Sequence, residues 1–164
     1  MTAVTIVPIA AEHIESFHAV LDEVAREKRY LAMTQAPPLE KVREYVTGNI
    51  ASGVPHFVAL AGSELIGWCD AWIRPQEGWR HCGTLGMGVL HSYRGRGIGA
   101  ALLGATLQRA KETGLTRVEL SVRLDNERAK KLYENFGFVV EGLGRRHQRI
   151  DGEYHDSYMM ALLF

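Results

Sequence analysis

Apolar residues in the N-terminal part of this chain recur first as a strand and then as two helices. Residues 3–8 predict a short strand that ends at Pro8. A helix ending near Tyr30–Leu31 follows, and its apolar face consists of Ile14, Phe17, Leu21, Val24 and Ala25. Pro37-Pro38 then interrupts the chain just before a second helix, whose apolar face carries Leu39, Val42, Val46 and Ile50.

The middle of the chain has the pattern of antiparallel strands. Strands are predicted over residues 56–61, 65–73 and 81–90, joined by a hairpin turn at Gly62-Ser63 and by a longer loop over 75–79. A helix is predicted from about Gly97 to Thr113, and Gly114 stops it.

The C-terminal part returns to strands around one more helix. Residues 117–122 alternate, with Val118, Leu120 and Val122 on one face. Asn126 can cap the next helix, whose apolar stripe of Ala129, Leu132, Tyr133 and Phe136 ends at Gly137. Two last strands, over 138–141 and about 154–163, flank a polar segment that contains the turn signal Asp151-Gly152.

The predicted order is therefore β-α-α-β-β-β-α-β-α-β-β, in one domain over residues 1–164. A run of strands followed by strands that alternate with helices implies an α/β fold, α+β in some schemes. We expect a mixed, mostly antiparallel sheet of about seven strands with helices on both faces. The step from Leu85 to Val122 is expected to be a right-handed parallel crossover.

The formal net charge is zero, from 19 Lys+Arg against 19 Asp+Glu, which argues against a binder of nucleic acid or of a membrane surface. The charges are not evenly distributed along the chain. Residues 94–149 hold twelve basic and six acidic residues, a net of +6, and the remainder has a net of −6. Fourteen of the basic residues are Arg, which favours bidentate contacts to phosphate or carboxylate groups, so the second half is where an anion site is expected.

Cysteine, histidine and hydropathy patterns exclude several classes. Cys69 and Cys82 are not in CxxC spacing and are interpreted as two buried free thiols. The seven His residues form no HxxxH or HExxH pair, so no metal is expected. No apolar run reaches the length of a membrane span, and the N-terminus lacks the basic region of a signal peptide, so neither a transmembrane helix nor a signal peptide is expected. The expected location is the cytoplasm.

The most informative stretch is GMGVLHSYRGRGIGAALL, residues 86–103, which reads as an apolar strand, a polar turn and the start of a helix. Glycines in the turn let backbone amides approach a ligand without interference from Cβ. A helix N-terminus has unpaired N–H groups and partial positive charge, so a phosphate fits there. Arg94 and Arg96 would add charge-assisted contacts.

This turn has three other interpretations. Gly95-x-Gly97-x-x-Ala100 also matches the dinucleotide-binding fingerprint, with Glu119 placed as the ribose-binding acid. However, HSYR separates the strand from the first glycine, and only 65 residues follow Gly99, too few for the second half of that fold. A P-loop is excluded because no Gly-Lys-Ser/Thr follows. The remaining alternative is a glycine-rich turn that binds nothing.

The turn and a second motif together resemble the GCN5-related N-acetyltransferase (GNAT) family, which moves an acetyl group from acetyl-CoA to an amine. The first motif is Arg94-Gly95-Arg96-Gly97-Ile98-Gly99-Ala100, and the second contains Asn126, Ala129, Leu132-Tyr133-Glu134 and Gly137-Phe138. The motifs lie 27 residues apart from Gly99 to Asn126, and the resemblance extends to the strand order of the whole chain. It implies acetyl-CoA as cosubstrate, direct attack by the amine, and a tetrahedral intermediate without a covalent enzyme adduct.

The resemblance also implies how the coenzyme is held. The pyrophosphate would lie on the amides from Gly95 to Ala100, and the pantetheine arm would pair with the strand backbone at Met87, Gly88 and Val89. That arm would occupy a splay between the strand that ends at Leu90 and the strand over 117–122. Asn126 would touch the pantetheine region, although a plain helix cap predicts the same residue type.

Tyr133 corresponds to the family's general acid, which protonates the departing thiolate. A thiol has a pKa near ~8.5 and a tyrosine near ~10, so this proton transfer is feasible. The alternative interpretation is a core tyrosine, because Tyr133 lies in the apolar stripe of its helix.

The base and the acceptor site are less defined by the sequence. Family members that acetylate ribosomal protein N-termini carry Glu five residues before the Asn, and this chain has Ser121 there. Candidate bases by location are Glu27, Asp70 and His81, and Glu27 with Tyr30 lies where family members bind acceptors.

A C-terminal segment, GLGRRHQRIDGEYHDSYMM over residues 142–160, resembles a subgroup that acts on free amino acids and similar small amines. Arg145, Arg146 and Arg149 could receive a substrate carboxylate, and the interpretation preferred here is a solvated basic loop.

The sequence therefore predicts an acetyl-CoA-dependent N-acetyltransferase for a primary amine of a small molecule, an amino acid or similar. Two alternatives stay open: acetylation of peptide or protein amines, and a non-catalytic acyl-CoA-binding regulatory domain. No nucleic-acid or membrane partner is expected, and a homodimer is possible.

Overall fold

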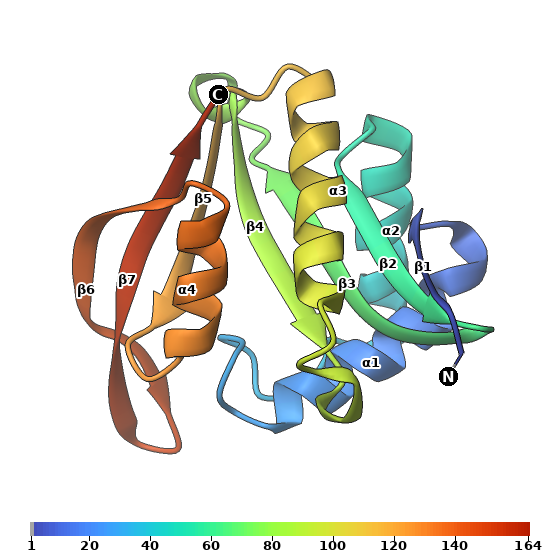
Figure 1. Cartoon of the computed structure of the whole chain (residues 1–164), viewed down its shortest axis with the longest axis horizontal. Helices are drawn as coiled ribbons and strands as arrows, with labels where there is room; N and C mark the ends of the chain where they lie inside the picture. Colours follow the sequence, from blue (N-terminus) through green and yellow to red (C-terminus); the bar gives the residue numbers. More distant parts are fainter. Residues whose placement is uncertain (1) are drawn as a thin grey trace.

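A seven-stranded mixed sheet, in the order β1-β2-β3-β4-β5-β7-β6, runs through the molecule (Figure 1). The structure is a computed structural model and describes residues 2–164. The strands are β1 (Val4–Pro8), β2 (His56–Ala61), β3 (Glu64–Ile73), β4 (Cys82–Val89), β5 (Arg117–Arg123), β6 (Val139–Ile150) and β7 (Glu153–Leu163). The helices are α1 (Ile14–Arg26), α2 (Leu39–Ser52), α3 (Ile98–Glu112) and α4 (Glu127–Asn135), with short 3-10 turns at Ala11–His13, Glu77–Trp79 and His91–Tyr93.

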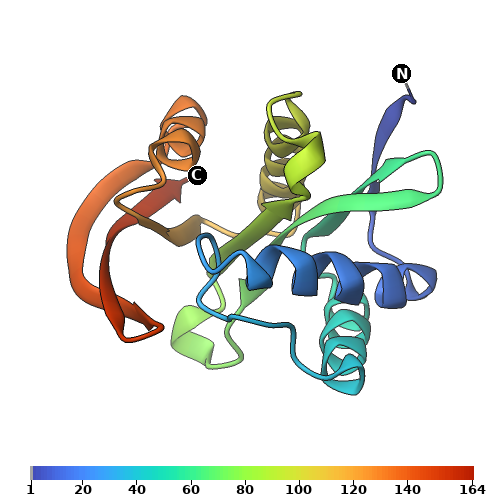
Figure 2. The same cartoon turned by 90° about the horizontal axis from the view of Figure 1, so that it is seen from below.

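The helices cover both faces of the sheet, as the sequence predicted. Figure 2 shows α1 and α2 on one face and α3 and α4 on the other. The core lies on both sides of β3: Leu102 and Leu103 of α3 are fully buried on one side, and Val24 of α1 and Val46 of α2 on the other. Burial of these helix stripes against the sheet is the main stabilising contribution.

One pair of strands is parallel, β4 with β5, and their pairing is short. Only Cys82–Arg117, Gly83–Val118 and Thr84–Glu119 are paired, after which the two strands diverge. All other neighbours in the sheet are antiparallel. The predicted element order and the predicted mixed sheet are confirmed, and so is the opening between β4 and β5.

Two predictions about helices were wrong. The first helix ends at Arg26 and not near Tyr30–Leu31, because Lys28 adopts a left-handed φ of 56° that a helix cannot continue through. Ile50 was expected on the buried face of α2, but 46% of it is exposed, whereas Val42 and Val46 are buried as predicted. The buried face of α2 is thus narrower than the apolar face that the sequence predicted.

The C-terminal hairpin also differs from the prediction. β6 was expected to stop at Glu141, but it continues to Ile150 through the polar segment and pairs with β7 up to the turn at Asp151-Gly152. The apolar alternation stops because this end of the hairpin is exposed on most of its surface, so its ladder of backbone hydrogen bonds needs no apolar side chains. Bulges at Val140/Gly142 and Gly144/Gln148 interrupt the register.

Cys69 and Cys82 are both buried and free, as the sequence predicted. Within residues 2–164, no helix is long and apolar enough to cross a membrane.

Candidate active site

The glycine turn connects β4 to α3 and exposes the first amides of the helix. Gly95 and Gly97 have φ values of 81° and 78°, a conformation that L side chains rarely adopt. Gly97 is the N-cap of α3 and provides no side chain to bind the first-turn amides, whereas its carbonyl accepts a hydrogen bond from Ala101 N at 3.0 Å. The N–H groups of Ile98, Gly99 and Ala100 therefore lack helical partners, as an anion site requires.

A cavity of about 610 Å³ lies in the opening between β4 and β5. The coenzyme residues that the sequence predicted line it, with the exception of Arg96: Met87, Gly88, Val89, Arg94, Gly95, Gly97, Ile98, Gly99, Ala100 and Asn126. Arg96 instead donates to Ser92 O at 2.9 Å and lies over the Tyr93 ring. The turn and the divergent strands thus form one continuous cavity.

The sequence analysis missed three arginines of this cavity, Arg29, Arg123 and Arg128. Arg128 Nη2 would lie 3.2 Å from a Cβ at Gly95, so this side chain is close to the glycine turn. Arg123 donates to Asp125 Oδ2 at 2.6 Å and to Lys28 O at 3.2 Å. The local excess of Arg between residues 94 and 149 was the signal for Arg123 and Arg128, but the charge count does not select individual residues, and Arg29 lies outside that segment.

Tyr133, on α4, also lines this cavity. It is 8% exposed, and its ring packs at a tilt against Phe138, 5.7 Å away between centroids. Burial raises the pKa of the Tyr133 hydroxyl above its ordinary value of 10.0, so the hydroxyl keeps its proton at neutral pH. Asn126, at the start of the same helix, accepts a hydrogen bond from Ala129 N at 3.2 Å, as the predicted cap requires.

Arg94 and Glu27, both singled out from the sequence, bind each other. The Arg94 guanidinium forms two hydrogen bonds to the Glu27 carboxylate, of 2.8 and 2.5 Å, and lies over the ring of Tyr30. Tyr30 lines the first cavity. The Glu27 carboxylate is therefore held by a cation at the rim of this cavity.

A second cavity, of about 500 Å³, lies on the α1–α2 side of the sheet. It adjoins the first along β4, because Thr84, Leu85 and Gly86 line the second cavity and Met87, Gly88 and Val89 line the first. The segment after α1 also borders both, with Tyr30 in the first cavity and Leu31 in the second. Most of the second lining is aliphatic or aromatic.

Asp70 is the one carboxylate in the described lining of the second cavity. It is 5% exposed and accepts a hydrogen bond from the Tyr45 hydroxyl. Burial raises the pKa of Asp70 to about 7, against the opposing effect of that hydrogen bond. Asp70 can therefore change its protonation state near neutral pH.

His81, the third candidate base, lies far along β4 from the glycine turn. It is exposed just before the strand, and its carbonyl accepts hydrogen bonds from Thr116 and Arg117. It lines neither cavity. Arg145, Arg146 and Arg149 lie on β6 outside both cavities, and the last two stack on Tyr154, at 5.0 and 5.4 Å. This placement agrees with a solvated basic segment.

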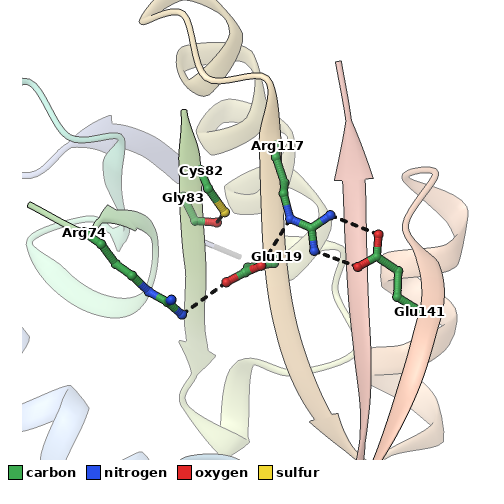
Figure 3. Close-up of polar contacts among 6 residues, drawn as sticks. All are labelled: Arg74, Cys82, Gly83, Arg117, Glu119 and Glu141. Atoms are coloured by element: carbon green, nitrogen blue, oxygen red, sulfur yellow. Dashed lines mark hydrogen bonds and ion pairs between the residues drawn. The ribbon is translucent and has the colours of Figure 1, made fainter. Parts of the chain in front are cut away.

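A series of ion pairs connects side chains near the residues where β4 and β5 pair. Figure 3 shows Glu119 between Arg74 and Arg117, with Arg117 reaching on to Glu141 of β6. The nitrogen–oxygen distances are 3.2 Å for Arg74–Glu119, 3.1 Å for Arg117–Glu119 and 2.6 Å for Arg117–Glu141. Glu119 is thus engaged away from the first cavity, which contradicts its alternative interpretation as a ribose-binding acid. Among the described residues, no group of three or more His, Cys, Asp or Glu could hold a metal ion.

Comparisons with known proteins agree with this geometry. The model of the acetyltransferase (GNAT) family matches residues 17–138. The L-amino acid N-acetyltransferase AaaT of Escherichia coli is 29% identical over 110 residues, 66% of this chain and 68% of that protein. The N-alpha-acetyltransferase RimI of Mycobacterium tuberculosis is 45% identical over 74 residues, 45% of this chain and 44% of that protein. A phosphinothricin acetyltransferase from Sinorhizobium meliloti, solved in complex with acetyl-CoA, superposes with a TM-score of 0.92 and 21% identity, covering 100% of this chain and 89% of that chain.

Proposed function

The chain belongs to the GNAT family of acetyltransferases, which use acetyl-CoA, and from this premise we propose that it acetylates a primary amine of a small molecule. The observation that carries this proposal is the second cavity, which shares the β4 wall with the first. Its volume of about 500 Å³ is in the range of small-molecule sites. The similarity to an L-amino acid N-acetyltransferase supports the same class of acceptor.

The residues of the first cavity fit acetyl-CoA. The two glycines with positive φ and the free amides at Ile98, Gly99 and Ala100 suit the pyrophosphate. Arg94 and Arg123 of the lining are paired with Glu27 and Asp125, so Arg29 and Arg128 are the arginines that complement its charge. Beyond Thr84 the β5 side of β4 has no strand partner, so the backbone at Met87–Val89 can pair with the pantetheine arm. When bound, acetyl-CoA supplies an activated thioester carbonyl.

Tyr133 is proposed as the general acid. It lines the coenzyme cavity from α4, and no protein group within residues 2–164 hydrogen-bonds to its hydroxyl, so that proton is available to a ligand. Because its proton stays on the oxygen at neutral pH, Tyr133 can donate it as the C–S bond breaks and negative charge develops on sulfur.

The test is release of free thiol from acetyl-CoA across a panel of amines: amino acids, polyamines, aminoglycosides and short peptides. We expect release above the hydrolysis background with small amines, and acetylated product by mass spectrometry. Release with peptides alone would overturn the small-molecule acceptor. Tight coenzyme A binding without release for any amine would indicate a non-catalytic acyl-CoA-binding domain.

A further inference from the structure

Asp70 is a buried carboxylate without a cation. It accepts a hydrogen bond from the Tyr45 hydroxyl, and within residues 2–164 no Lys, Arg or His forms an ion pair with it. Among the described lining residues, Lys41 carries the one permanent positive charge, and it lies at the exposed rim and binds Glu44 at 2.9 Å. A buried charge without a partner is costly, so this carboxylate is suited to a cationic ligand.

Asp70 lies beside the part of β4 that borders both cavities. Asp70 is directly opposite Gly86 in the β3–β4 ladder, and the next residue of β4, Met87, already lines the coenzyme cavity. A Cβ at Gly86 would lie 3.1 Å from Asp70 Oδ1, so the glycine leaves room for the carboxylate. Asp70 thus lies at the place where the two cavities meet.

Tyr45 holds Asp70 in place, and a buried polar pair lies beside it. Tyr45 reaches it from α2, and Asn49, one turn further on, lies 3.2 Å from His56 Nδ1. His56 is directly opposite Asp70 in the β2–β3 ladder. Tyr45 fixes the carboxylate without contributing a positive charge, and burial lowers the pKa of His56 to about 3, so the neighbouring imidazole is neutral as well.

We propose that Asp70, oriented by Tyr45, binds the ammonium group of the acceptor and takes a proton from it, and that the acceptor is a primary amine on an apolar body. This inference rests on the proposed function, because it assigns the second cavity to the acceptor. It selects Asp70 among the candidate bases: Glu27 is neutralised by Arg94, and His81 is outside both cavities.

The proton balance is complete with these residues. Asp70 takes one proton from the ammonium, which leaves a neutral nitrogen with a lone pair. That pair forms the C–N bond to the acetyl carbon, and the C–S bond then breaks with its electrons leaving on sulfur, which receives a proton from Tyr133. The nitrogen loses a second proton, which restores the Tyr133 hydroxyl, and Asp70 releases its proton to solvent.

The lining sets the class of acceptor. Trp68 and Phe17 form an edge-to-face pair, 5.6 Å between centroids, and Leu21, Leu31, Met33 and Trp72 enclose the remaining space. Burial of an apolar group against these side chains is favourable, whereas a polar amine would find few hydrogen-bond partners there. Amines with an aromatic or branched apolar group, apolar amino acids among them, are therefore the expected acceptors.

The first experiment measures binding by calorimetry, without turnover. The probes are 2-phenylethylamine and the neutral 2-phenylethanol, titrated into the protein and into Asp70→Asn. We expect the substitution to weaken amine binding on the order of 30-fold and to leave the alcohol within about twofold. Equal amine affinity in both proteins, or equal loss for both probes, overturns the proposal. Ethanolamine binding as tightly as 2-phenylethylamine overturns the apolar acceptor class.

The second experiment uses Tyr45→Phe and pH, and it does not depend on the Asn variant folding. The titratable groups around Asp70 are Lys41 and Tyr45 in the lining and His56 across the ladder; the described α1 and β4 lining residues add none. Because the Tyr45 hydrogen bond lowers the pKa of Asp70, its removal should move the midpoint of amine binding from near pH 7 to higher pH. An unmoved midpoint contradicts the role of the pair.

The two proposals fail separately. If no amine is acetylated but 2-phenylethylamine binds in an Asp70-dependent manner, the enzymatic function is wrong and the ammonium site stands. If amines are acetylated and Asp70→Asn retains both the rate and the amine affinity, the function stands and the assignment of Asp70 is wrong.

Discussion

Arg94 and Glu27 join the glycine turn to the end of α1 through two parallel hydrogen bonds. The third donor of the guanidinium, Nε, binds Val89 O at 2.8 Å, and the plane of the group lies over Tyr30. The two side chains are 18% and 26% exposed, so water weakens this pair less than it weakens a surface pair. Arg94 therefore positions the segment that borders both cavities, and its guanidinium is not free for phosphate alone.

A double-mutant cycle of Glu27→Gln and Arg94→Gln tests this positioning role. Each single change should lower the free energy of unfolding by about 1–2 kcal/mol, and the double change should cost little more than one of them, because the same contact is lost. Urea unfolding measures all four proteins. Glu44→Gln, which breaks the exposed pair with Lys41, is the control and should not change stability measurably. Additive losses in the cycle would show that the two side chains act independently.

Tyr133→Phe removes the proposed acid and little else. The ring keeps its packing against Phe138, so the affinity for acetyl-CoA should stay within about twofold while kcat falls by roughly tenfold or more. Steady-state kinetics with an active acceptor and calorimetry with coenzyme A separate the two effects. Tyr154→Phe, on the exposed hairpin, is the matched control. Unchanged turnover in Tyr133→Phe would make the tyrosine a packing residue.

Gly88 allows the Trp68 indole to lie against β4. A Cβ at residue 88 would come within 2.4 and 2.5 Å of two ring carbons of Trp68, which is buried and cannot move aside. Gly88→Ala should therefore destabilise the fold by about 1–3 kcal/mol, measured by thermal or urea unfolding. Gly104→Ala, in α3 with its nearest neighbour at 3.7 Å, should instead stabilise it by about 0.5–1 kcal/mol. Equal effects at the two positions would contradict the contact with Trp68.

The parts of the site that depend on local sequence were predictable. The glycine turn, the Asn126 cap and the position of Tyr133 on its helix each follow from a few consecutive residues, because backbone conformation and helix capping are local properties. The lining of the first cavity matched these predictions with the exception of Arg96. A local pattern cannot say which way an exposed arginine turns, and Arg96 turns back to Ser92.

The parts that depend on tertiary contacts were not predictable. Glu27 was a candidate base until the fold brought Arg94, 67 residues away, onto its carboxylate. Asp70 gains its properties from Tyr45 on another element, a pairing that no spacing along the chain encodes. The polar half of β6 looked like a loop because its strand pairing uses backbone groups and leaves no apolar period.

His56 and Asp70 should give opposing pH dependences of stability. Burial lowers the pKa of His56 to about 3, below its unfolded value near ~6.5. The unfolded state therefore binds a proton first, and the free energy of unfolding falls as pH falls from about 6.5 to 3. Burial raises the pKa of Asp70 to about 7, so protonation of Asp70 favours the folded state and stability falls as pH rises from about 4 to 7. Each slope is at most about 1.4 kcal/mol per pH unit. In urea unfolding, Asp70→Asn should therefore stabilise the protein more at pH 8 than at pH 5. The same gain at both pH values would show that Asp70 does not titrate in this range.

Asn126 has one established contact and one proposed contact, and two substitutions distinguish them. Its Oδ1 caps α4 by accepting from Ala129 N, so Asn126→Ala should cost about 1 kcal/mol of stability. Asn126→Asp keeps an oxygen acceptor and should keep the cap, but it replaces the amide donor by a carboxylate in the first cavity. We expect Asn126→Asp to unfold like the wild type in urea and to bind coenzyme A at least about fivefold more weakly in calorimetry, because hydrogen bonds lost to a ligand cost of this order. Wild-type affinity in Asn126→Asp, together with lower stability in Asn126→Ala, would make Asn126 a helix cap alone.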